Sequence, residues 1–384
     1  MNVLFVLLAL AQSSWDLDAL GRAPTRVAAE GFESEGLQAI LYDGLPWKGK
    51  PTRVFAWLGL PKTDAPRVPA MVLIHGGGGT AFADWAKLWT GRGYAAIAMD
   101  LCGCVPRKLK NGWERHEQGG PPGWGGFEQI DDAEHDQWTW HAVADAILAH
   151  SLLRSLPEVD PDRIGVTGIS WGGYLTCIVA SLDPRFKFAA PVYGCGFLGE
   201  DSTWLDTFAK MGKEKSEKWL GLWDPSRYLK RASMPFLWVN GTNDFAYPLD
   251  SYQKSYRLAP TDRTLAVRIR MPHAHGGPGE KPEEIHAFAD SLFRGGTPLA
   301  RISGQGLEKD EVWATFASTR PVVRAELLFT KDSGKWQKRA WETAAAKIQG
   351  SRAWAAVPEG ARAFYLNLVD ERGLVVSSEH VERP

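Results

Sequence analysis

Short apolar runs rich in β-branched residues alternate with longer amphipathic segments through the first three quarters of the chain. Segments with helical spacing, such as 82–92 and 138–155, separate the runs. Continuous apolar strands that alternate with helices indicate a mostly parallel sheet with helices on both faces. We therefore predict an α/β domain over residues 12–297, with buried strands at residues 53–60, 70–75, 94–100, 163–169, 188–193, 235–240 and 265–271.

The pattern changes after residues 293–298, which read FRGGTP. From there apolar residues recur with a period of two at 312–317, 322–328 and 364–369, and turn-type sequences separate the segments. This predicts a small C-terminal β-sandwich of the immunoglobulin or fibronectin type over residues 298–384. The junction is short and is not rich in Ser, Thr and Pro, so we expect the sandwich to pack against the first domain. It contains no convincing nucleophile–base pair, so we expect it to take no part in the chemical step.

The N-terminus has the pattern of a secretory signal peptide. Residues 2–11 are apolar and end in Ala9-Leu10-Ala11, before the polar Gln12. This h-region and its small-residue cleavage site predict a signal peptide over residues 1–11 and a secreted or periplasmic protein. No other segment has the roughly 18–20 apolar residues that a membrane span needs.

Composition narrows the classes of partner. The 384 residues carry a formal net charge of −1, which argues against nucleic acid or an anionic membrane as the main partner. The four cysteines are too few for a disulfide scaffold in a chain of this length, although export would allow one bridge. The oligomeric state has no signature in the sequence.

Tryptophan is unusually frequent, with 18 residues. Two long connections, around 113–140 and 204–223, hold seven of them. Flat aromatic faces suit sugar rings, but the same residues would equally form a core or a lid that excludes water. Both readings stay open for Trp113, Trp124, Trp138, Trp140, Trp204, Trp219 and Trp223.

The stretch TGISWGGY at 167–174 places Ser170 between Gly168 and Gly172. A predicted buried strand precedes it and a predicted helix follows it. Glycines in a strand–serine–helix turn permit a strained backbone that lifts the serine oxygen above the sheet, and the helix N-terminus favours developing negative charge. The context predicts that Ser170 is a nucleophile.

An oxyanion hole requires backbone N–H groups that converge on one point. The predicted strand 70–75 ends at His75, and four glycines, residues 76–79, follow at once. Such glycines let the backbone approach a substrate oxygen closely. We predict the N–H groups of Gly77 and Trp171 as the two donors.

A catalytic acid and a base are expected after later strands, in the order serine, acid, histidine. Asp244 follows the predicted strand 235–240 and is preferred to Asp250, which is placed to cap a helix. Two histidines follow the last strand, and we favour His275 over His273 as the base, because His275 lies deeper in the loop. A His-x-His pair also suits a metal, but no further ligand has a suitable spacing, so no metal is expected.

These stretches, with LIHGGG at 73–78 and NGTND at 240–244, resemble the α/β-hydrolase superfamily. The resemblance covers residues 20–295 and is to bacterial acetyl xylan esterases, dienelactone-hydrolase-like esterases and prolyl-oligopeptidase-type peptidases. It implies a Ser170–Asp244–His275 triad and acyl transfer without a cofactor. Dienelactone hydrolases use cysteine where this chain has serine, and prolyl-oligopeptidase enzymes carry an N-terminal propeller for which this chain has no room.

The sequence thus predicts an exported serine esterase that removes short acyl groups, such as acetyl, from carbohydrates. The alternative is a prolyl-oligopeptidase-type exopeptidase, which would need carboxylates to hold a substrate amino terminus; Asp131, Asp132 and Glu134 are the candidates. A non-catalytic scaffold is a third reading, but such proteins usually lose a triad residue. The expected partner is a small-molecule or glycan ester.

Overall fold

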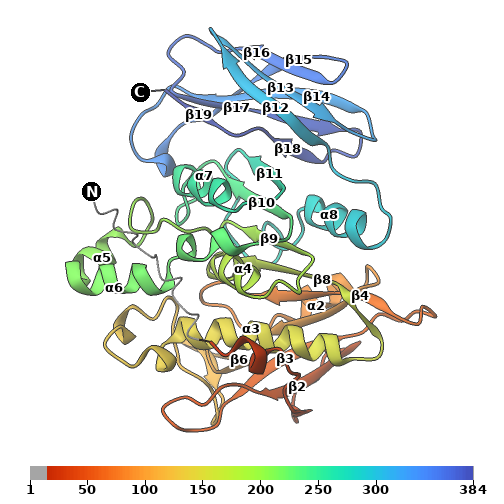
Figure 1. Cartoon of the computed structure of the whole chain (residues 1–384), viewed down its shortest axis with the longest axis vertical. Coiled ribbons are helices and arrows are strands. Elements are labelled where there is room, and N and C mark those ends of the chain that lie inside the picture. The colour runs from red at the N-terminus through yellow and green to blue at the C-terminus, as the bar shows by residue number, and fades with distance from the viewer. Residues whose placement is uncertain (1–14, 384) are drawn as a thin grey trace, which may run out of the picture.

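The computed structural model describes residues 15–383, and the predicted signal peptide lies outside this range. An α/β body and a β-rich body lie one above the other along the long axis of the molecule (Figure 1). The last helix of the first body, α8, ends at Phe293, and the first strand of the second, β12, begins at Arg301. No helix among residues 15–383 is long and apolar enough to cross a membrane.

The α/β body is built on a nine-stranded sheet in the order β1-β2-β3-β5-β4-β8-β9-β10-β11. The strands from β5 to β11 in this order are parallel, whereas β1, β2 and β3 join antiparallel at one edge. The mostly parallel sheet expected from the apolar runs is therefore present. Its strands are β1 (Arg26–Ala28), β2 (Leu37–Asp43), β3 (Arg53–Gly59), β4 (Val68–Ile74), β5 (Ala95–Met99), β8 (Val159–Ile169), β9 (Phe188–Val192), β10 (Phe236–Gly241) and β11 (Arg263–Arg268).

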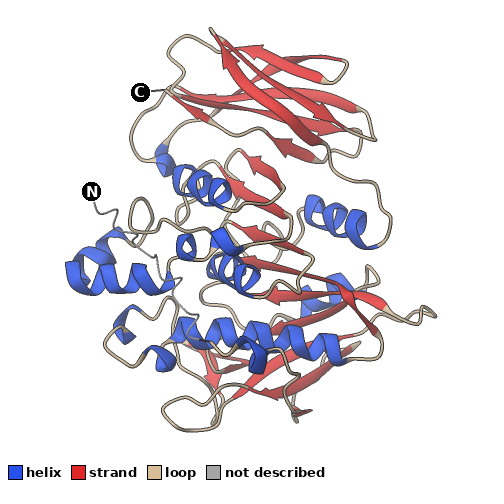
Figure 2. Cartoon of the chain, viewed as in Figure 1, coloured by secondary structure: helices blue, strands red, loops and turns tan. Residues whose placement is uncertain are grey.

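Helices cover both faces of this sheet (Figure 2). Side chains alternate along each strand: Val72 and Ile74 of β4 belong to the core on one face, and Met71 and Leu73 to the core on the other. The first core includes α3 (Trp138–Ser155), α4 (Trp171–Leu182), α6 (Lys213–Trp223) and α7 (Leu249–Leu258). The second includes α2 (Ala83–Thr90) and α8 (Glu283–Phe293). The remaining elements here are α1 (Leu17–Leu20), α5 (Leu205–Met211), the hairpin of β6 (Cys104–Leu109) and β7 (Gly112–Arg115), and the short 3-10 helices η1 (Phe127–Gln129), η2 (Glu134–Asp136), η3 (Pro225–Arg227) and η4 (Leu229–Arg231).

The C-terminal body is all β. Its eight strands form one antiparallel sheet in the order β12-β13-β16-β15-β14-β17-β18, with β19 pairing to β17, and the sheet folds over its own apolar core. The expected β-domain is thus formed by a continuous folded sheet. Its strands are β12 (Arg301–Glu308), β13 (Glu311–Ala317), β14 (Val322–Thr330), β15 (Glu342–Gln349), β16 (Arg352–Ala356), β17 (Ala363–Asp370), β18 (Val375–Ser377) and β19 (Val381–Glu382); a short 3-10 helix, η5 (Trp336–Lys338), lies between β14 and β15.

The β-domain packs on the edge strand β11, as the short junction predicts. The Ser377 hydroxyl accepts a hydrogen bond from the N–H of Val267 at 2.8 Å, and the Asn367 amide donates to the Val267 carbonyl at 3.0 Å. An apolar cluster that includes Val267, Leu249 and Trp341 joins the two domains. An uncovered edge strand is an aggregation hazard, and here side chains of the second domain satisfy its backbone.

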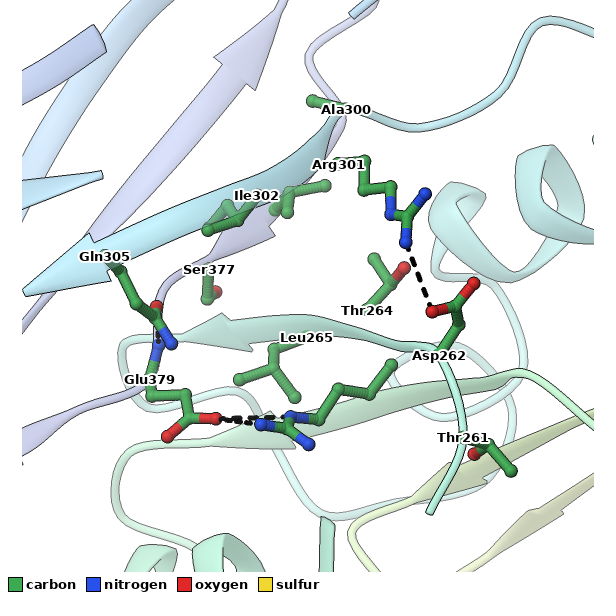
Figure 3. A pocket seen from close by; sticks show the side chains of 12 residues that line it. Thr261, Asp262, Thr264, Leu265, Ala300, Arg301, Ile302, Gln305, Ser377 and Glu379 are labelled. Carbon is green, nitrogen blue, oxygen red and sulfur yellow. Dashed lines mark hydrogen bonds and ion pairs between the residues drawn. The ribbon is translucent and has the colours of Figure 1, made fainter. Parts of the chain in front are cut away.

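Charged groups surround a cavity of about 220 Å³ at this interface (Figure 3). Arg301 pairs with Asp262 at 3.2 Å, and Arg263 pairs with the largely buried Glu379 at 2.7 Å. The Gln305 side chain accepts a hydrogen bond from the N–H of Glu379. Each of these charged side chains thus meets its counter-charge within the interface.

Ser377→Ala should destabilise the protein, because it leaves the buried N–H of Val267 without an acceptor. The expected cost is about 1–3 kcal/mol, seen as a fall of a few degrees in Tm by differential scanning fluorimetry. Ser303→Ala is the matched control, since Ser303 is exposed on β12 in the same domain. Equal Tm values for the two variants would contradict this account of the interface.

Candidate functional site

Ser170 lies at the sharp turn between β8, which ends at Ile169, and α4, which begins at Trp171. Its backbone has φ 59° and ψ −119°, a conformation that residues with a Cβ rarely adopt. The Ser170 N–H donates to the carbonyl of Val192 on β9 at 3.0 Å, which ties the turn to the neighbouring strand. This is the strained strand–serine–helix turn that the glycine pattern predicts.

Glycine is required around Ser170 because backbones pass very close to one another. A Cβ on Gly172 would lie 1.9 Å from the carbonyl oxygen of Ile74, and one on Gly168 would lie 2.1 Å from the carbonyl oxygen of Gly172. No side chain fits at either position. The first turn of α4 can therefore lie directly over β8 and the end of β4.

The glycine-rich segment after β4 lies beside this turn. A Cβ on Gly77 would lie 2.9 Å from Cδ1 of Trp171, so the two predicted oxyanion donors belong to adjacent segments. Trp171 is the first residue of α4, so its N–H has no acceptor within the helix. Gly78 adopts φ 72°, and the N–H of Gly79 closes a turn onto the carbonyl of Gly76.

His75 holds the start of this glycine-rich segment in place. Its ring Nδ1 lies 2.9 Å from the Gly76 carbonyl oxygen, and its Nε2 accepts the N–H of Leu101 at 3.1 Å. Burial lowers the pKa of His75 to about 3, so the ring is neutral at neutral pH and Nδ1 carries the hydrogen that it donates. Both ring nitrogens are therefore engaged in hydrogen bonds to the backbone, and His75 is not a candidate base.

Asp244 is buried in the loop after β10, with 2% of its surface exposed. One carboxylate oxygen accepts the N–H groups of Ala246 and Tyr247 at 2.9 and 2.8 Å. The other lies 2.6 Å from Nδ1 of His273, whose ring stacks on Tyr193 with centroids 4.2 Å apart. Asp244 is thus held rigidly and orients the ring of His273.

His275 has a different carboxylate partner. Its Nδ1 lies 3.1 Å from Oε1 of the buried Glu280, and its Nε2 accepts the N–H of Gly76 at 2.8 Å. A Cβ on Gly76 would lie 3.0 Å from Cβ of Ser170 and 3.2 Å from Nε2 of His275, so this ring is also close to the serine. The His275 ring also contacts Phe82, with ring centroids 4.5 Å apart, and Trp85, with ring centroids 6.0 Å apart.

The pairing of Asp244 with His275 expected from the sequence is wrong, because Asp244 binds His273. The physical difference lies in the ring lone pairs. The Nε2 lone pair of His275 already accepts a backbone N–H, whereas His273 donates from Nδ1 to Asp244 and keeps its Nε2 lone pair for another proton. Glu280, which the sequence reasoning missed, is a carboxylate only five residues after His275.

Comparisons with known proteins agree with this architecture. Residues 26–201 match the acetyl xylan esterase family, and residues 128–293 match the prolyl oligopeptidase family. The acetyl xylan esterase from Paenibacillus sp. R4 superposes with a TM-score of 0.56 at 22% identity, covering 72% of this chain and 92% of that one. Acetyl xylan esterase 1 from Thermoanaerobacterium sp. JW/SL YS485 superposes with a TM-score of 0.53 at 19% identity, covering 68% and 89%.

The chain belongs to the α/β-hydrolase superfamily. Its relatives are serine hydrolases, esterases in one family and peptidases in the other. A curated relative, the uncharacterized peptidase YuxL of Bacillus subtilis (strain 168), is 26% identical over 218 residues. These are 54% of this chain but only 30% of that protein's length.

In this α/β-hydrolase the C-terminal domain touches the loop that carries Asp244. The side-chain amide of Asn243 donates toward the carbonyls of Trp336, Gln337 and Arg339 at 3.4, 3.3 and 2.7 Å. Asn243 directly precedes Asp244, so the segment around η5 fixes the backbone from which the Asp244 side chain projects. The sequence places these residues more than 90 positions apart and gives no sign of this contact.

The tryptophans of the hydrolase are mostly structural. Trp138, Trp219 and Trp223 are fully buried, and Trp124, Trp140 and Trp204 are partly buried against the same core. This favours the core reading of these residues over a platform for sugar rings. All four cysteines are free thiols, so no disulfide bridge forms between them.

We expect the loss of His273 to lower kcat more than the loss of His275, as their hydrogen bonds indicate. His273→Ala should lower kcat by about 10³-fold or more, because triad residues act as a unit. His275→Gln should lose less, since its side-chain oxygen can still accept the N–H of Gly76. The measurement is kcat and its pH profile on a small aryl ester.

The pH profile separates a base from a structural residue. The acidic limb of the kcat profile should survive in His275→Gln and be absent from the residual activity of His273→Ala. Near-complete loss in His275→Gln, with full activity in His273→Ala, would return the role of base to His275.

Proposed function

We propose that this α/β-hydrolase is a serine esterase in which Ser170, His273 and Asp244 form the triad. The observation that carries the proposal is the combination of a strained serine at the strand–helix turn with a histidine whose Nδ1 is fixed by a buried aspartate. That pairing leaves Nε2 of His273 as the acceptor for the serine proton.

The reaction would proceed by acyl transfer in two steps. The Ser170 hydroxyl attacks the ester carbonyl carbon while Nε2 of His273 takes its proton, and Asp244 stabilises the resulting imidazolium. The tetrahedral intermediate collapses, the C–O bond to the alcohol breaks, and the imidazolium returns its proton to the leaving alkoxide. Water then attacks the acyl-enzyme by the same route and releases the acid and Ser170.

The negative charge of the tetrahedral intermediate would rest on the N–H groups of Gly77 and Trp171. These lie on adjacent segments next to Ser170 and at the N-terminus of α4, where the helix dipole adds favourable potential. Removing one such donor typically costs about 2.7–4 kcal/mol of transition-state stabilisation. The bond from Gly76 to His275 would hold the segment in place.

Two observations favour an ester over a peptide as substrate. The structural likeness to acetyl xylan esterases extends over nearly the whole of those proteins. Two of the three carboxylates considered for holding a substrate amino terminus are engaged elsewhere, since Asp131 pairs with Lys215, and Asp132 pairs with Lys48 at 3.2 Å. A short-acyl ester of a carbohydrate is the proposed substrate, and the sequence of residues 1–11 supports export.

Ser170→Ala should fold like the wild type and lose at least about 10³-fold in kcat on 4-nitrophenyl acetate. A fluorophosphonate probe should label Ser170 in the wild type and nothing in the variant, as read by mass spectrometry of the labelled peptide. Turnover of 4-nitrophenyl acetate should exceed that of a proline 4-nitroanilide. Full activity in the variant would overturn the serine mechanism, and a preference for the anilide would favour the exopeptidase.

A further inference from the structure

A cavity of about 360 Å³ adjoins the histidine–aspartate pair, and both domains line it. The α/β domain contributes His273, Asp244 and Arg270. The C-terminal domain contributes Lys338 and Arg339 from the segment at η5, the same segment that holds Asn243. In the proposed triad, a substrate that contacts both Ser170 and His273 would therefore lie next to this cavity and to the second domain.

The cavity carries an excess of positive charge. Arg270 and Lys338 are exposed and form no side-chain ion pair within residues 15–383, whereas Arg339 pairs with Glu382 at 2.7 Å. The carboxylate of Asp244 offsets one of these charges, with its oxygens turned to two backbone N–H groups and to Nδ1 of His273, so a net positive charge remains in the cavity. The cations of the interface cavity in Figure 3, by contrast, are each paired with a carboxylate.

The backbone presents Arg270 in an unusual way. Arg270 has φ 46°, a left-handed conformation in which arginine is uncommon, and its N–H donates to the hydroxyl of Thr242 at 3.1 Å. A glycine or asparagine would adopt this turn at less cost. A strained arginine beside a reaction centre indicates that its side chain has a role there.

We propose that this cavity binds a carboxylate carried by the substrate, so that the preferred substrates are acidic esters. Arginine and lysine from two walls would hold the carboxylate by charge-assisted hydrogen bonds. The carboxylate sits either on the acyl group, as in a dicarboxylic half-ester, or on the alcohol, as in an ester of an acidic sugar. This inference rests on the proposed esterase function.

The test compares esters of similar size with and without the charge. On the alcohol side the pair is 4-acetoxybenzoate and 4-acetoxybenzamide; on the acyl side it is mono(4-nitrophenyl) succinate and 4-nitrophenyl butyrate. For each pair the ratio of kcat/KM, anionic over neutral, is measured in the wild type, Arg270→Gln and Lys338→Gln. Lys331→Gln is the matched control, because Lys331 is exposed in the same domain and does not line the cavity.

We expect one of the two ratios to fall by about threefold to tenfold in each of Arg270→Gln and Lys338→Gln, and to stay constant in Lys331→Gln. The wild-type ratio should also fall between 0.05 and 0.5 M NaCl, as screening predicts. The pair that responds identifies the side of the ester that carries the charge. Ratios that are equal in all four proteins, for both pairs, would overturn the proposal.

Binding separates this inference from the proposed function. Ser170→Ala should bind 4-hydroxybenzoate or succinate more tightly than the corresponding amide by calorimetry, and should lose that preference when Arg270→Gln is added. Carboxylate binding of this kind without turnover of any ester would refute the esterase function and leave the anion site standing. Equal binding of acid and amide for both compounds would refute the anion site alone.

Discussion

The close crossing of α4 over the ends of β4 and β8 is the constraint on which the rest of the site depends. The Cα of Gly172 lies so near the Ile74 carbonyl that a Cβ would come within 1.9 Å of the oxygen. This approach lets the chain turn at once from strand to helix, with Ser170 at positive φ and the indole ring of Trp171 against Gly77. The proposed nucleophile and the proposed oxyanion donors are thus positioned by a single backbone packing.

Much of this could be predicted from the sequence because its cause is local. A parallel strand buried on both faces must be apolar throughout, and a backbone crossing at such short range must use glycine, so both leave a signature in a few consecutive residues. The order of serine, acid and histidine follows from the order of the strands. Trp138 and Trp219 could not be assigned in this way, because the sequence around a buried tryptophan does not differ from the sequence around a tryptophan that stacks on a ligand.

The choice between His273 and His275 shows where such reasoning stops. The two residues follow the same strand, are two positions apart and differ little in local sequence. What distinguishes them is which carboxylate each ring meets, Asp244 for His273 and Glu280 for His275. Asp244 lies 29 residues before its histidine in the chain, whereas Glu280 lies five residues after its own. Only the pairing of His275 with Glu280 is short enough in sequence to leave a local signal. That signal indicates that His275 already has a carboxylate partner.

The position of the C-terminal domain follows from the sheet itself. β11 is the last strand of the nine, and its outer edge would expose unpaired backbone groups unless another element covered it. The two strands at this edge of the sheet also lead directly into the candidate site. The loop after β10 carries Asp244, and the loop after β11 carries His273. A domain that covers the edge of β11 must therefore border the loops that carry Asp244 and His273. Asn243 and Gln337 form the contact that results, so the domain that protects the sheet edge also fixes the backbone beside Asp244, the proposed catalytic acid.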